Sequence, residues 1–398
     1  MADPEHTRLV KQGPHAIARW REQRYWVRRQ LDLSGAILNR AKLVNADLTR
    51  DNLSHVDLTD SDLHRADLCG TNLRGAHLWR SNLSQANLRG ASMAGASLVR
   101  TNLAGSCLQG ADLRGADLSF ADLSRADLEG ANLSGANLTE TDLSWANLND
   151  ADLRNAKLTA TILHLTDLTG ADLRAASLLK VVLDGAKFSN AVVEMTLFAD
   201  CDLSQVVGLD QVKHDGPSII GADSLTRSGG YIPDSFLRQA GVEESLIGFQ
   251  EQLRKGLRRT PRVLLVSALK DGEFAARIQA DLRESGTLCW SLVIDDEDAF
   301  RLDDGQIKRV TYYDCLALVC STHSLESPYA CRLFEQLTRE SSKPSGQAVL
   351  PIAIDDVLLR REDRLCAALR QAGAIDFRGW EQGQVYKDSL KGLVEALF

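Results

Sequence analysis

The chain has 398 residues, of which 44% are apolar and 25% charged, a length and balance that predict a globular protein of more than one domain. Its net charge of −8 disfavours nonspecific nucleic-acid binding by the chain as a whole. No apolar run approaches the ~20 residues that span a bilayer, so we expect a cytoplasmic protein and no membrane partner. The eight cysteines show no C-x-x-C spacing, which favours reduced thiols over a metal site or disulfides.

Residues 1–30 are predicted to form an N-terminal helical cap. Leu9, Val10, Ile17 and Trp20 approximate one helical face, and Gly13-Pro14 should divide the helix. Such a cap would cover the open first coil of the repeat that follows, whose strand edges otherwise meet solvent. The alternative is a contact with nucleic acid or acidic lipid through a basic and aromatic cluster, namely Arg19, Trp20, Arg21, Arg24, Tyr25, Trp26, Arg28 and Arg29.

Residues 31–205 repeat with a period of five. From Leu33 to Leu203, every fifth residue is large and apolar at 35 consecutive positions, and the residue two before it is nearly always small. A period of five fits neither a helix nor a strand, so it predicts a repeating coil. If each pentad forms one side of a four-sided turn, Leu and the small residue point inward, and the Asp or Asn between them points outward. Stacking of the coils then closes a core and pairs the backbone groups.

Units such as Ala111-Asp112-Leu113-Arg114-Gly115 carry an A(D/N)Lxx signature and resemble the pentapeptide-repeat family. The resemblance implies a right-handed quadrilateral β-helix of about nine coils, roughly 42 Å long at ~4.8 Å per coil. Some pentapeptide-repeat proteins resemble duplex DNA and occupy type II topoisomerases. A DNA-mimicking gyrase interactor is therefore one hypothesis for this chain.

The charges along the repeat argue against mimicry of DNA over its whole length. Residues 31–205 hold 22 acidic and 15 basic residues, or seven net negative charges, whereas ~42 Å of duplex carries about 25. No acidic residue lies between Leu68 and Ala111. The arginines in this stretch predict a cationic band, which is either ordinary solvated surface or a docking site for an acidic partner: Arg74, Arg80, Arg89 and Arg100.

Near the end of the repeat, outward positions become apolar at Ile162, Val182, Val192 and Leu197. Apolar outward side chains need a cover, and we expect the next segment to provide it rather than a second copy of the protein. That segment, residues 206–261, loses the period of five but is rich in Ile, Leu and Phe. It is predicted to be a packed helical adaptor with helices at 235–240 and 243–257.

Residues 262–398 alternate short apolar strands with helices. We expect strands at 263–266, 316–320, 347–354 and 374–377 and helices at 273–284, 360–371 and 385–397. This alternation predicts a parallel sheet covered on both faces, with the strand ends as its working edge.

Motifs across this region resemble the Toll/interleukin-receptor (TIR) domain. They are Ser267 and Asp271 after the first strand, Cys289-Trp290 after the first helix, Ser321 and Ser324 after a buried strand, Tyr329, and Trp380 near the end. The resemblance implies a flavodoxin-like α/β fold with five parallel strands.

The resemblance also implies where a TIR active site would lie. Catalytic TIR domains cleave the nicotinamide–ribose bond of NAD with one glutamate, four residues past an aromatic residue. The aromatic corresponds to Tyr329, which puts Leu333 at the glutamate position. Glu335 lies two residues further on and about 200° around the helix, so its use would require a shift in helix register.

Three functional hypotheses follow. The leading one is a non-enzymatic interaction or scaffold protein that presents a degenerate TIR-like module in bacterial signalling or defence. It implies protein partners, self-association through the TIR-like domain among them, and no cofactor. The alternative is a TIR-type NAD glycohydrolase that uses Glu335, and NAD enters only under that hypothesis. The second alternative is the gyrase interactor, with nucleic acid itself not expected as a partner.

Overall fold

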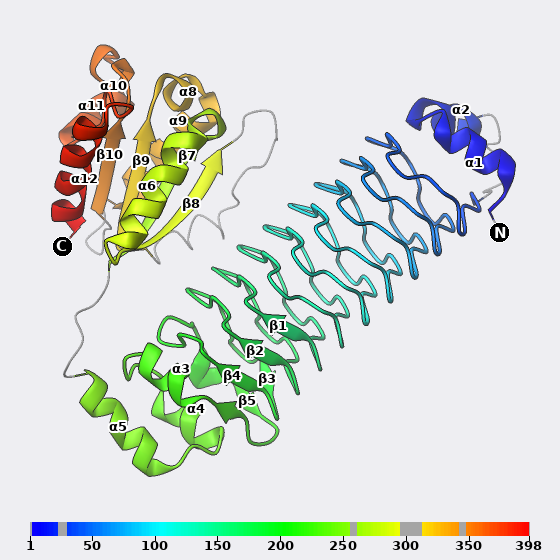
Figure 1. Cartoon of the computed structure of the whole chain (residues 1–398), viewed down its shortest axis with the longest axis horizontal. Coiled ribbons are helices and arrows are strands. Elements are labelled where there is room, and N and C mark those ends of the chain that lie inside the picture. Colours follow the sequence, from blue (N-terminus) through cyan, green and yellow to red (C-terminus); the bar gives the residue numbers. More distant parts are fainter. Residues whose placement is uncertain (1, 23–29, 255–260, 295–312, 342–347, 398) are drawn as a thin grey trace. The chain divides into compact units, whose positions relative to one another are not determined.

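The computed structural model describes residues 2–22, 30–254, 261–294, 313–341 and 348–397. The chain forms two compact units, Met1–Leu257 and Arg258–Phe398. Each unit is built around its own kind of sheet, a stack of coils in the first and an open parallel sheet in the second (Figure 1). Among the described helices, none has the length and apolarity needed to cross a membrane.

The first unit is dominated by a solenoid of coils, each made of four pentads (Figure 1). Residues twenty apart form parallel bridges, such as Asp32 with Asn52 and Asn52 with Asn72. Each coil is tied to the next through the backbone, as where the Leu33 N–H donates to the Asn52 carbonyl at 2.7 Å. The central Leu of each pentad is buried along the stack. The predicted inward leucines and the unbroken register are confirmed.

Small polar residues at the inward positions satisfy their own hydrogen bonds. The Thr71 hydroxyl donates to the Leu48 carbonyl and the Thr101 hydroxyl to the Leu78 carbonyl, both at 2.7 Å. Each pentad up to residue 200 ends at a corner residue with a left-handed backbone, for example Gly35 at φ 69° and Arg40 at φ 57°. Glycine is frequent at this corner because it adopts positive φ without a steric cost.

Two helices close the first coil. Helices α1 (Pro4–Lys11) and α2 (Pro14–Glu22) bury Val10 and Ile17 in the same core as Leu31 and Leu33. Gly13, at φ 91°, lies between the helices and allows the predicted division. Residues 24–29 of the basic and aromatic cluster lie outside the described residues.

An ion pair joins this cap to the stack. Asp51 occupies an inward position that is small elsewhere, and its carboxylate is fully buried. Its Oδ1 accepts from the Leu31 N–H at 2.8 Å, and its Oδ2 accepts from Arg21 Nη2 at 2.7 Å. Arg21 also donates to the Asp47 carbonyl at 3.0 and 3.1 Å. Arg21, a member of the predicted surface cluster, therefore acts inside the cap.

We expect the native protein to lose stability as the pH rises towards the pKa of Asp51. The Asp51→Asn variant should not show this pH dependence. Burial raises the pKa of Asp51 to about 6, against the opposing effect of Arg21, whereas the ordinary value is 3.8. Between these values the folded state binds more protons than the unfolded state. Stability should therefore fall by about 3 kcal/mol as the pH rises through this window, and then level off.

Thermal unfolding across that pH window measures the effect. Asp47→Asn is the matched control, because Asp47 also contacts Arg21 but its side chain is 49% exposed. The pH dependence should persist in the control. Its persistence in Asp51→Asn would show that another group titrates.

At the other end, strand pairing continues beyond residue 205. Strands β1 (Lys157–Thr159), β2 (Ser177–Leu179), β4 (Leu197–Ala199) and β6 (Ile219–Ile220) form a parallel sheet, and β3 (Val192–Val193) pairs with β5 (Lys213–His214). A short 3₁₀ helix, η1 (Leu209–Gln211), precedes β5. The segment after the repeats thus begins by adding to the stack.

Three helices complete this end: α3 (Ala222–Arg227), α4 (Asp234–Gln239) and α5 (Glu244–Arg254). The last two match the predicted helices, and α3 was not predicted. Phe236 of α4 meets Phe198 of the stack with ring centroids 5.9 Å apart. The hydroxyls of Ser224 and Ser228 accept from the backbone N–H groups of Cys201 and Leu203. These contacts cover the core where the repeats end.

The prediction that this segment buries the apolar outward side chains is wrong for Val182, which is 36% exposed. Ile162, Val192 and Leu197 are half-buried. The reason is geometric, because the segment extends the stack at its open end instead of folding back over its side. Leu197 pairs with Ile219 of the added strand β6 through the backbone.

The second unit is a five-stranded parallel sheet in the order β11-β10-β9-β7-β8. The strands are β7 (Arg262–Ala268), β8 (Leu288–Ile294), β9 (Cys315–Cys320), β10 (Ala348–Ala353) and β11 (Ile375–Asp376). The connections contain η2 (Leu269–Asp271), α6 (Gly272–Glu284), α8 (Thr322–Glu326), α9 (Pro328–Ser341), α10 (Val357–Arg360), α11 (Arg364–Gln371) and α12 (Gly383–Leu397).

Both faces of this sheet are covered. Phe274 of α6 and Tyr386 of α12 are buried with Val263 and Leu265 of β7. The alternate β7 side chain Leu264 is equally buried, as expected for a parallel sheet. The predicted parallel sheet is confirmed.

Two details differ from the sequence prediction. Strand β8 was not predicted, because it is an edge strand whose side chains alternate between buried and exposed. The helix expected at 360–371 begins only at Arg364, as α11, and the separate helix α10 ends at Arg360. Asp363 begins α11 by accepting from the Cys366 N–H at 3.0 Å, and a helix that starts with its own cap does not continue the previous one.

Candidate functional site

The strand order places a topological switch point between β7 and β9. From β7 the chain proceeds to β8 on one side, whereas β9 leads to β10 and β11 on the other. In open parallel sheets, ligands bind beside the carboxyl ends of the strands at such a point. Four predicted motif residues lie at or just after these two strand ends: Ser267, Asp271, Ser321 and Ser324.

Three of these side chains are joined directly. The Ser321 hydroxyl donates to Asp271 Oδ2 at 2.6 Å and accepts from the Ser324 N–H at 3.0 Å. The Ser321 N–H in turn donates to the Ser324 hydroxyl at 2.9 Å, which makes a capping box at the start of α8. Burial raises the pKa of the Asp271 carboxyl. The motif residues thus tie the β9–α8 turn to the end of β7.

Ser267 lies beside this group at the end of β7. Its hydroxyl is fully buried and has no hydrogen-bond partner among the residues that the structure describes.

A second carboxylate at this edge was not predicted from the sequence. Asp355 follows β10, and its Oδ2 accepts from the N–H and the hydroxyl of Thr322 at 2.7 and 2.8 Å. Its Oδ1 accepts from the Val357 N–H at 2.9 Å. An acidic residue just after a buried strand, as at Asp271, was the available signal. Both strand-end carboxylates are therefore used to hold loops.

The two tryptophans among the motif residues pack against other aromatic rings. Trp290 is in register with Leu264, on the amino-terminal half of β7, and its ring packs edge-on against Tyr313 at 5.8 Å. Trp380 packs against Phe274 of α6 at 5.3 Å. Tyr329 lies in the first turn of α9 and is half-buried.

Helix α9 also carries the two positions on which catalysis would depend. Leu333 is buried in the unit, with 3% of its surface exposed. Glu335 lies on the exposed side of the same helix. The expected separation of these two side chains around the helix is observed.

On the solenoid, the four arginines of the predicted band lie on three different sides of the coil. Arg80 and Arg100 occupy equivalent corners of adjacent coils, whereas Arg74 and Arg89 belong to pentads on two other sides. Arg80 lies over the Trp79 ring at 5.2 Å and pairs with Asp60 at 3.4 Å.

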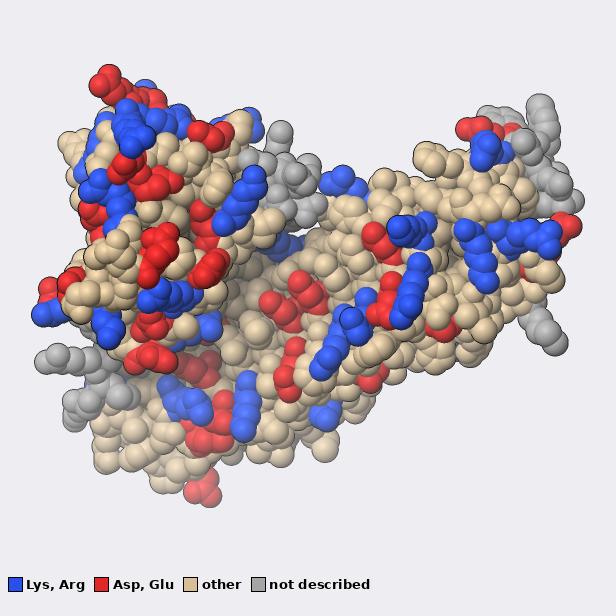
Figure 2. Space-filling model, turned by 45° about the horizontal axis from the view of Figure 1, so that its top comes forward, with Lys and Arg blue, Asp and Glu red and all other residues tan. Residues whose placement is uncertain are grey.

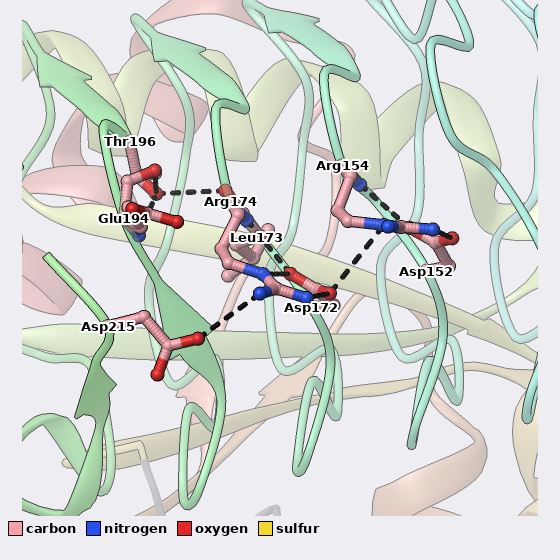
Figure 3. A network of polar contacts seen from close by, with 8 residues as sticks. All are labelled: Asp152, Arg154, Asp172, Leu173, Arg174, Glu194, Thr196 and Asp215. Atoms are coloured by element: carbon pink, nitrogen blue, oxygen red, sulfur yellow. Dashed lines mark hydrogen bonds and ion pairs between the residues drawn. The ribbon is translucent and has the colours of Figure 1, made fainter.

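On the side of the solenoid that carries Arg74, arginines also pair with the outward carboxylates. Figure 3 shows Arg154 bound to Asp152, and Asp172 placed between Arg154 and Arg174. The Arg154 guanidinium holds the pKa of Asp152 below its usual value. Arg174 also pairs with Asp215, in the segment after the repeats, at 3.2 Å. The network joins the last coils to that segment, and Figure 2 shows basic and acidic side chains interspersed along the visible coils.

Comparison with protein families agrees with both units. Residues 29–205 match the pentapeptide repeats family in eight copies, over 29–65, 52–90, 81–119, 96–135, 136–174 and 166–205. Residues 263–393 match the TIR domain family. The chain is a pentapeptide-repeat protein with a C-terminal TIR domain. No curated protein matches it.

Solved structures similar to this chain are also pentapeptide-repeat proteins. HetL from Nostoc sp. strain PCC 7120, involved in heterocyst differentiation regulation, is 32% identical over 47% of this chain and 84% of its own, with a TM-score of 0.33. QnrB1, a plasmid-mediated fluoroquinolone resistance protein, is 20% identical over 44% of this chain and 91% of its own, with a TM-score of 0.31. A pentapeptide repeat protein from Nostoc PCC 7120 is 36% identical over 30% of this chain and 84% of its own, with a TM-score of 0.17.

Proposed function

We propose that this protein is a non-enzymatic interaction module, in which a pentapeptide-repeat solenoid carries a TIR domain that acts through protein contacts in signalling or defence. The observation that supports this proposal is the buried Leu333 at the position of the TIR catalytic glutamate. An alkyl side chain offers no charge to an oxocarbenium-like transition state, which is the role of that glutamate.

The two carboxylates at the strand ends support the same conclusion. Asp271 and Asp355 bind the Ser321 hydroxyl and the Thr322 backbone. A carboxylate whose oxygens already hold a turn is poorly placed to stabilise a substrate cation as well. Loss of either bond would detach the β9–α8 turn, so we assign both residues to loop positioning.

The alternative function is NAD hydrolysis through Glu335. We expect purified Glu335→Ala and native protein to show the same absence of NAD consumption, because Glu335 is on the exposed side of α9. Nicotinamide release measured by chromatography is the test. Turnover by the native protein that disappears in Glu335→Ala would establish the alternative, because removing a transition-state group costs orders of magnitude in rate.

Leu333→Glu provides a further arm of this experiment, with Leu333→Met as the control that preserves volume. Activity gained only in Leu333→Glu would show that a single residue separates this domain from a catalytic one. Circular dichroism of each variant shows whether the fold is retained.

We expect no inhibition of gyrase by this protein at a stoichiometric ratio. Paired carboxylates such as Asp112 with Arg114 and Asp152 with Arg154 present much less negative charge than DNA phosphates do. The arginines between residues 68 and 111 would also be repelled by a DNA-binding groove.

A supercoiling assay, with gyrase alone as the control, measures this directly. Strong inhibition at a stoichiometric ratio would contradict the charge argument and restore the gyrase hypothesis.

A further inference from the structure

One corner of the solenoid forms a column of nine residues, one from each successive coil. The residues are Arg40, Asp60, Arg80, Arg100, Phe120, Glu140, Ala160, Lys180 and Asp200, and all have φ between 55° and 60°. The N–H of each of the first eight donates to a carbonyl of the next coil, as from Arg100 to Ser119 and from Phe120 to Thr139. The residues therefore repeat at one backbone position, at ~4.8 Å intervals.

The charges in this corner column are antisymmetric about Phe120. Arg100 and Glu140 each lie one coil from Phe120, on opposite sides of it, and have opposite charges. Arg80 and the neutral Ala160 each lie two coils from it. The next two pairs are Asp60 with Lys180 and Arg40 with Asp200. Three of the four pairs are opposite in sign, and none has like charges.

The centre of the corner column is exposed and apolar. Phe120 is 46% exposed, and Trp79, which adjoins Arg80 two coils away, is 40% exposed. Arg100 lies over the Phe120 ring at 5.5 Å. Exposed aromatic side chains flanked by charges are typical of protein–protein contact surfaces.

We propose that the corner column is a self-association surface whose partner is a second copy of this chain. Two solenoids lie antiparallel, side by side, with a two-fold axis at Phe120. This arrangement brings Phe120 against the partner's Phe120 and Arg100 against the partner's Glu140. A two-fold axis repeats each contact, so the two remaining opposite-charge pairs also form twice.

A second column on the same side of the coil agrees with this register. Ile37 is 64% exposed, and the same two-fold axis brings it to the partner's Leu197. Asp117 would face the partner's Asp117 near the axis. That carboxylate already accepts from Asn137 Nδ2 at 2.9 Å and from the Ser119 hydroxyl at 2.7 Å, which lessens the repulsion.

Other registers are less favourable. Moving the axis by one coil to Arg100 places this side chain against the partner's Arg100, and Asp60 against the partner's Glu140. Moving it by one coil to Glu140 places two glutamates on the axis, and Arg100 against the partner's Lys180. Like charges in contact oppose association, so the corner column selects the axis at Phe120.

The size of the surface predicts a weak dimer. Nine coils at ~4.8 Å and a side about 10 Å wide give roughly 400 Å² per partner, about half of the ~800 Å² of a standard interface. Asp60 and Asp200 already pair with Arg80 and Arg227 within one chain. The fraction of dimer should therefore depend on protein concentration, and the affinity should fall as salt screens the charges.

Sedimentation velocity of the full chain tests the proposal at about 0.05 M and about 0.5 M salt, where the Debye length differs severalfold. We expect a dimer at low salt that weakens at high salt. Arg100→Glu and Glu140→Arg should each raise the dissociation constant about tenfold or more, because each creates two like-charge contacts. Arg89→Glu, on another side of the coil, is the matched control and should leave the dissociation constant unchanged.

Charge exchange makes the test specific. The double variant with Arg100→Glu and Glu140→Arg should dimerise again, and a mixture of the two single variants should form a heterodimer. A native chain that stays monomeric at low salt would overturn the proposal. A dimer whose dissociation constant is unchanged by both charge reversals would also overturn it, because such a dimer would form through another surface, for example the TIR domain. The inference stands independently of whether the TIR domain hydrolyses NAD.

Discussion

Replacing Leu118 by Asp should unfold the solenoid. Leu118 is fully buried at an inward position in the middle of the stack. Truncating such a side chain alone costs about 2–5 kcal/mol, and the carboxylate adds the cost of a buried, unpaired charge. The total is comparable with the entire stability of a typical domain.

Chemical denaturation followed by circular dichroism measures this loss. Leu118→Met should cost less than about 1.5 kcal/mol, because it preserves apolar volume. Asn132→Asp places the same carboxylate at an outward position of the stack and should be tolerated. A Leu118→Asp protein with native stability would mean that this leucine does not face the core.

A chain that ends at Gln205 should aggregate, whereas a chain that ends at Leu257 should not. The shorter chain loses Phe236, which covers Phe198, and the serine hydroxyls that accept from Cys201 and Leu203. Each large side chain left uncovered forfeits about 1.5–3 kcal/mol of burial, and the last coil becomes an open strand edge.

Light scattering of the two purified chains compares them directly. The chain that ends at Leu257 retains the whole first unit and is the matched control. A monodisperse chain 1–205 would show that the last repeat coil needs no cover.

The repeat was predictable because its physics is local. Each pentad buries one large residue at a fixed spacing, so the position of Leu113 or Leu133 follows from the sequence alone. The same holds for buried strands such as β9, in which every side chain is buried.

Contacts between distant residues were less predictable. The motif at Ser321 indicated the site, but its bond to Asp271, 50 residues away, depends on how the strands pair. The pairing of Arg21 with Asp51 likewise requires α2 to dock on the first coil. Strands β5 and β6 have only two residues each, which is too short for a periodic pattern.

The charge pattern of the corner column was visible in the sequence but could not be interpreted from the sequence alone. Its residues are printed in the sequence at intervals of twenty, but their charges acquire meaning only when the corners are known to align. The hydrogen bonds from Arg100 to Ser119 and from Phe120 to Thr139 in the next coil supply that alignment.

The most direct test of the account is NAD consumption by the purified native protein, with and without enforced clustering through a fused oligomerisation domain. Leu333 at the glutamate position predicts no nicotinamide release above that of a buffer control in either state. Clustering is included because it tests the domain at high local concentration. Turnover that appears on clustering and is lost in Glu335→Ala would contradict the account and make this protein a TIR-type NAD glycohydrolase.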